Sequence, residues 1–140
     1  MSNAAATNAA ATNAAVTPEL VHWFEIPVSD LSKATAFYEA MLDTKLIQHA
    51  EDGVAQAMVP NALQTAPCGA LFADPTRPPR RGHGTVVYLL ARGGVKRTLA
   101  RAVEAGGKVV KHATPIPPNG TIALVEDPDG NLIGLHDEHA

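Results

Sequence analysis

Short apolar runs typical of β-strands alternate along the chain with apolar residues at helical spacing, and each change from one pattern to the other predicts a new strand or helix. The short apolar run 21–28 predicts a strand, which the cap residues Ser29 and Asp30 end. Phe37 and Met41 then recur at helical spacing and predict a helix that ends near residues 43–44. Three further strands are expected, at 45–50, 54–59 and 68–73.

The second half repeats this plan after a connection rich in Pro, Arg and Gly. The pattern predicts a strand at 85–91, a helix at 93–105, and strands at 108–111, 121–125 and 132–136. Four apolar residues should share one face of this helix: Val95, Leu99, Ala102 and Val103. A shift of 63 residues places Lys45 on Lys108 and one helix on the other, which indicates an internal duplication.

A half of about 50 residues would be a marginal domain alone, so the two halves should pair. We expect an α+β fold in which two paired βαβββ modules, 21–74 and 84–137, form an open barrel-like mixed sheet around a cleft, with the helices outside. The modules would make one domain, 18–140. Residues 1–17, rich in Ala, Asn and Thr, should form a disordered tail, because they hold too little apolar surface to offset ordering entropy.

Composition narrows the classes of partner. The net charge is −3 and the chain has no block of basic residues, so it lacks the positive surface that binding to nucleic acid or to an anionic membrane needs. No apolar run approaches the roughly 20 residues that span a bilayer. The single cysteine, Cys68, excludes an intrachain disulfide, and with no activating neighbour in sequence it should be a buried structural thiol. We therefore expect a cytoplasmic protein, with the arginines of 77–81 in a solvated loop.

Two motifs resemble a known family. The segment EIPVSDLSKATAFYEAML (25–42) looks like the opening strand and helix of the vicinal oxygen chelate family, and VEDPDGN (125–131) resembles its closing turn. That family includes glyoxalases, extradiol dioxygenases and bleomycin-resistance proteins, many of which hold one divalent metal in the cleft with ligands from four strands. The resemblance also implies a homodimer.

The family's ligand positions can be carried over one by one. The first ligand stands seven residues before the Asp that starts the helix, which is Trp23 here, and its mate 63 residues on is Val86. The ligand of the last strand follows the closing turn and falls on Gly134, whose partner by the same shift is Leu71. None of these residues offers an imidazole, carboxylate or thiolate, so we expect no metal and no other cofactor.

Strand alternation adds neighbours on the same face. Glu25 should share the face of Trp23, Tyr88 that of Val86, and His136 that of Gly134, whereas His22 should point away. Glu25 could be a catalytic base or ligand contact, or simply a member of a structural ion pair. His136 could equally be an exposed residue near the chain end. Trp23 and Tyr88 could stack on a ring or belong to the core.

These residues favour a metal-free protein that binds a small, partly aromatic or polar molecule in the cleft. The alternative is a lyase, isomerase or oxygenase of the family, with Glu25 as base or a divalent metal site rebuilt with His136. A third alternative is an accessory protein that binds a partner through the loop 75–81. His83 in this loop and His49 and His112 after the helices are expected at the surface.

Overall fold

The computed structural model describes residues 23–61, 67–82 and 84–138. The first half contains β1 (Phe24–Pro27), α1 (Leu31–Leu42), β2 (Ile47–Glu51), β3 (Val54–Val59) and β4 (Gly69–Phe72). The second contains β5 (Val87–Leu90), α2 (Val95–Glu104), β6 (Lys108–Pro115), β7 (Thr121–Glu126) and β8 (Leu132–Asp137). Every predicted helix and strand is confirmed, although β6 continues four residues past its predicted end. The expected tail, 1–17, lies outside the described residues.

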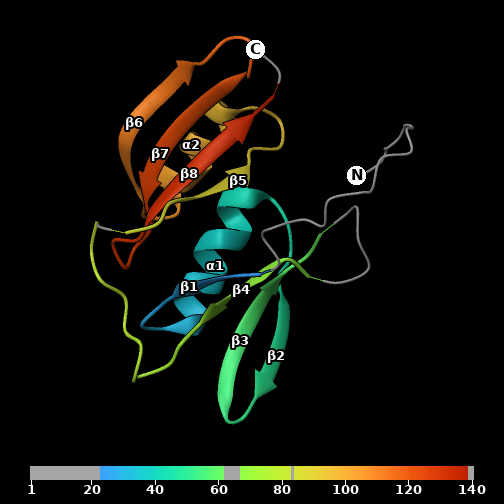
Figure 1. Cartoon of the computed structure of the whole chain (residues 1–140), viewed down its shortest axis with the longest axis vertical. Helices are drawn as coiled ribbons and strands as arrows, with labels where there is room; N and C mark the ends of the chain where they lie inside the picture. Colours follow the sequence, from blue (N-terminus) through green and yellow to red (C-terminus); the bar gives the residue numbers. More distant parts are fainter. Residues whose placement is uncertain (1–22, 62–66, 83, 139–140) are drawn as a thin grey trace, which may run out of the picture.

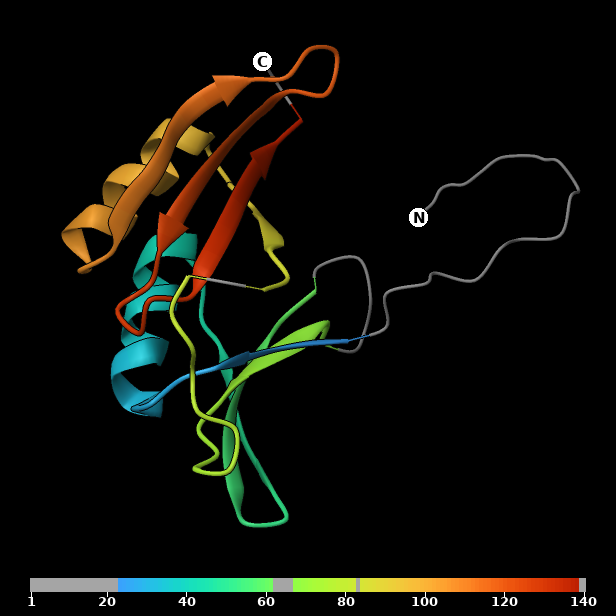
Figure 2. The same cartoon turned by 60° about the vertical axis from the view of Figure 1, so that its left-hand side comes forward.

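Each half forms its own four-stranded mixed sheet. The orders are β1-β4-β3-β2 and β5-β8-β7-β6, with the first pair parallel in each sheet and the others antiparallel. The matching orders confirm the α+β fold of paired βαβββ modules, and Figures 1 and 2 show that the sheets do not close into a barrel. The expectation of one continuous sheet is wrong. Within the described chain the halves meet through α1 and α2, which contact each other, while the short edge strands β1 and β5 form no ladder.

Both helices cover the same side of the molecule (Figure 2). Asp30 caps α1 by accepting a hydrogen bond from the backbone N–H of Lys33, and Gly94 precedes α2 at a positive φ of 106°. The core between helices and sheets includes Phe37, Met41, Leu71, Leu99 and Leu135. Of the four apolar residues expected on one face of α2, Val95, Leu99 and Ala102 are buried, whereas Val103 is 51% exposed.

The turn at the end of β7 joins the two halves. Asp127, 4% exposed, accepts a 2.7 Å hydrogen bond from the hydroxyl of Tyr38 in α1, which is 1% exposed. The side-chain amide of Asn131 donates both to Asp127 and to the carbonyl oxygen of Pro27 at the end of β1. Burial raises the pKa of Tyr38 well above its usual value, and it raises the pKa of Asp127 against the opposing effect of its hydrogen bonds. The motif shared with the family therefore has a structural role.

Cys68 is half-buried beside β3, where burial raises the pKa of its thiol, in keeping with a structural residue. Neither described helix is long and apolar enough to cross a membrane.

Candidate functional site

The sheet faces that point away from the helices carry three of the predicted site residues, Trp23, Glu25 and Tyr88. In sheet β1-β4-β3-β2, Ile26 and Val28 are buried toward α1, whereas Trp23 and Glu25 are exposed on the opposite face. In the second sheet Leu89 is buried, and Tyr88 lies on the opposite face. The predicted alternation is confirmed at these strands, and we call the two surfaces opposite the helices the open faces.

Glu25 is held on the first open face by two donors. The indole N–H of Trp23 donates to its Oε2 at 3.2 Å, and Nη1 of Arg77 donates to its Oε1 at 2.9 Å. The carboxylate is therefore a member of an ion pair at the edge of solvent rather than a buried lone charge. The structural alternative for Glu25 is thus observed, and both of its oxygens are already engaged.

Arg77 is fixed from three directions. Its guanidinium carbon lies 4.1 Å from the centre of the Phe72 ring, and its Nε contacts Asp74 at 3.4 Å. The backbone N–H and hydroxyl of Thr76 donate to Asp74 and lower the pKa of its carboxyl group. The sequence alone predicts a solvated loop for Arg77. The spacing of Asp74, Thr76 and Arg77, typical of an Asx turn, was the available signal that this loop is folded.

The second open face is more apolar. Tyr88 is 50% exposed and Leu90 64% exposed, and both lie beside strand β8. The ring of Tyr88 covers Gly134, since a Cβ at that glycine would overlap the ring. Half-buried His136 places its Nε2 2.7 Å from the carbonyl oxygen of Asn119. A carbonyl can only accept, so Nε2 carries the proton and, in the neutral ring, Nδ1 is the basic nitrogen.

The expected equivalence of Leu71 and Gly134 is wrong by one residue. Gly134 pairs with Tyr88, whereas the strand partner of Glu25 is Ala70. Leu71 pairs instead with Ile26 and lies fully buried in the core. The connections between elements differ in length between the two modules, so the shift is 63 at the first strand, from Glu25 to Tyr88, and 64 at the last strand, from Ala70 to Gly134.

The inherited metal positions do not fit a divalent cation. Trp23, Val86, Gly134 and Ala70 contribute no carboxylate, imidazole or thiolate, and the Tyr88 ring occupies the space above Gly134. Within 23–61, 67–82 and 84–138, no three His, Cys, Asp or Glu residues gather as a metal site. Glu25 and His136 lie on different sheets, and no contact between them is found in this part of the chain.

The other histidines lie apart from this arrangement. His49 and His112 are exposed, as expected. His22 and His83 lie outside the described residues, so their predicted orientations stay predictions. Val86 lies half-buried immediately before β5.

Known proteins share the sequence pattern and the fold of this chain. Residues 20–135 match the family model of the glyoxalase/bleomycin resistance protein/dioxygenase superfamily, and no curated protein matches the chain. A glyoxalase/bleomycin resistance protein from Streptomyces sp. CB03234 is 32% identical over 82% of this chain and 97% of its own, with a TM-score of 0.53. One from Albidiferax ferrireducens T118 is 19% identical over 84% and 97%, with a TM-score of 0.62. A glyoxalase I mutant from Zea mays is 24% identical over 86% of this chain and 47% of its own, with a TM-score of 0.66.

Proposed function

The chain belongs to the glyoxalase/bleomycin resistance protein/dioxygenase superfamily, and we propose that it binds a small, partly aromatic molecule on its open faces without a divalent metal. The observation that carries this proposal is the array of Trp23, Glu25 and Arg77. The Glu25 carboxylate holds an indole and a guanidinium side by side, a combination suited to a ring with polar substituents.

Each member of the array has a defined contribution. The hydrogen bond to Glu25 fixes the orientation of the Trp23 ring, which is 40% exposed and can stack on a ligand. Arg77 is preorganised by Phe72 and the two carboxylates, and its further N–H groups can donate to a ligand's oxygen atoms. Tyr88 supplies a second exposed ring on the other open face.

A second candidate function is favoured by His136. Its hydrogen bond to the carbonyl of Asn119 sets the tautomer, which is how a general base is oriented in many enzymes. A metal-free isomerase or lyase would then use Nδ1 of His136 as its base, since both oxygens of Glu25 are engaged. Turnover of candidate substrates that is lost in His136→Gln, with ligand binding retained, would establish this function in place of binding alone.

Trp23 is the single tryptophan of the chain, so its fluorescence reports on the proposed site directly. A panel of small aromatic acids, amines and phenols should include compounds that quench this emission saturably. Arg77→Met should weaken such binding by about tenfold, because a charge-assisted hydrogen bond is lost. Arg80→Met removes an exposed arginine of the same loop and should leave the affinity unchanged. Equal effects of the two substitutions, or no ligand in the panel, would contradict the proposal.

We also propose that the protein forms a homodimer in the cytoplasm. The exposed apolar side chains on the second open face, among them Leu90, are compatible with a partly covered surface. Sedimentation velocity of the full chain at several concentrations tests the dimer, and a monomer at every concentration would contradict it.

A further inference from the structure

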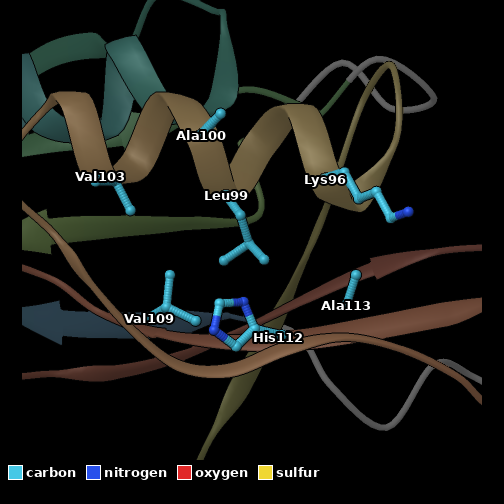
Figure 3. Close-up of a pocket in the computed structure, with 7 residues that line it drawn as sticks. All are labelled: Lys96, Leu99, Ala100, Val103, Val109, His112 and Ala113. Carbon is cyan, nitrogen blue, oxygen red and sulfur yellow. The ribbon is translucent and has the colours of Figure 1, made fainter.

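A groove lies on the helix side of the second module, between α2 and β6, away from the open faces. Figure 3 shows Leu99 and Val103 pointing from the helix toward the strand and Val109 and Ala113 pointing back, with the ring of His112 lying along the strand between them. The groove has a volume of about 530 Å³, within the size range of small-molecule sites. Its lining consists of Lys96, Leu99, Ala100, Val103, Val109, His112 and Ala113.

Irregular strand pairing helps to create this groove. β6 is the edge strand of its sheet, and its register against β7 shifts between Val109 and Lys111 and again between Lys111 and Thr114. Such bulges add residues on one strand, and here two consecutive residues, His112 and Ala113, both line the groove. The exposed side chain of Val103 forms part of the opposite wall together with Leu99.

The charges of the lining select an anionic ligand. Lys96 and His112 are its polar members, and no acidic side chain belongs to it. Within the described part of the chain, the ammonium of Lys96 forms no ion pair. We propose that this groove binds a small monocarboxylate with an apolar chain, which lies along Leu99, Val103 and Val109 while its carboxylate meets Lys96 and His112.

The same features disfavour a β-strand as the occupant. The two register shifts interrupt the regular backbone spacing that an added strand needs, a device that protects sheet edges from pairing. A groove walled by side chains of one helix and one strand suits a narrow alkyl chain instead.

Calorimetric titration of the full chain with octanoate and with 1-octanol tests the proposal, because the two probes share their chain length and differ in charge. Octanoate should bind at least about tenfold more tightly than 1-octanol. Lys96→Met should abolish that preference, whereas Lys33→Met, which removes an exposed lysine of α1, should preserve it. Ala113→Phe should fill the groove and abolish binding of both probes.

Methyl NMR of the unsubstituted protein keeps the proposal testable if the filled variant does not fold. Octanoate should shift the methyl signals of Leu99, Val103 and Val109. Shifts confined to the open faces, for example at Leu90, would overturn the proposal, as would equal affinity for the two probes or no binding. A concentration-dependent dimer that Val103→Asp disrupts, without octanoate binding, would show that a second copy occupies the groove and would also overturn it.

Discussion

Replacing Tyr38 by Phe isolates one buried hydrogen bond among the contacts that hold the two modules together. The substitution removes one hydroxyl and leaves the ring, which packs edge-on against Phe37 with centroids 5.1 Å apart. Asp127 would lose one of four donors, keeping the side-chain amide of Asn131 and the backbone N–H groups of Asp129 and Asn131. The buried carboxylate would then be incompletely hydrogen-bonded.

The expected loss of stability follows from burial and from the charge of the acceptor. A hydrogen bond to a charged group contributes about 2 kcal/mol, more than a neutral one, and neither partner can turn to water here. For a domain of this size, a loss of about 2 kcal/mol lowers Tm by about 8 °C. Urea unfolding followed by circular dichroism should show a lower midpoint with an unchanged m value.

Tyr88→Phe is the matched control. Tyr88 is half-exposed, and its hydroxyl forms no hydrogen bond among the described residues, so the free energy of unfolding should change by less than about 0.5 kcal/mol. If the two substitutions cost the same, the Tyr38–Asp127 bond contributes no more than an exposed hydroxyl. The structural role assigned to the closing turn would then be refuted.

Four further outcomes are expected. Because burial raises the pKa of Tyr38 in the folded protein, the stability that its neutral hydroxyl contributes is present below pH 10 and is lost as pH rises through the folded-state pKa. At pH 11 the folded wild type and folded Tyr38→Phe should therefore have the same phenolate absorbance at 295 nm. The two proteins should differ in this absorbance only after unfolding. Gly134→Ala should displace the Tyr88 ring and change ligand affinity more than stability, as titration and thermal unfolding can compare, because the ring can rotate outward. Arg101→Met should destabilise the protein by about 1–2 kcal/mol in urea unfolding, because its guanidinium donates to a backbone carbonyl of α1 at 2.9 Å. Because burial raises the pKa of Cys68, iodoacetamide at pH 8 should react much faster with the unfolded than with the folded protein, and equal rates would contradict the assigned burial.

Local patterns in the sequence were sufficient for the elements and for the choice of sheet face. The alternation at Glu25 and Ile26 and the helical spacing of Phe37 and Met41 reflect burial that each segment experiences by itself. The two-module plan could be predicted for the same reason, since both halves carry the same pattern of short strands and one helix.

Long-range features could not be predicted in this way. Length differences between the connections of the two modules make Ala70, and not Leu71, the equivalent of Gly134, and a single fixed shift cannot account for such differences. Arg77 reaches Glu25 across 52 positions of sequence, which no periodicity records. Val103 follows the helical pattern, yet it is 51% exposed, because it lines the open groove between α2 and β6.

The indole N–H signal of Trp23 offers the most direct test of metal-free ligand binding, because the chain has one tryptophan and hence one such signal. ¹H–¹⁵N spectra would follow it while an aromatic compound from the fluorescence panel is added, with and without a chelator. We predict the same saturable shift and the same Kd in both conditions, and no shift with Zn²⁺ or Ni²⁺ at one equivalent. A stoichiometric shift with either ion, together with ligand binding that the chelator abolishes, would contradict the account.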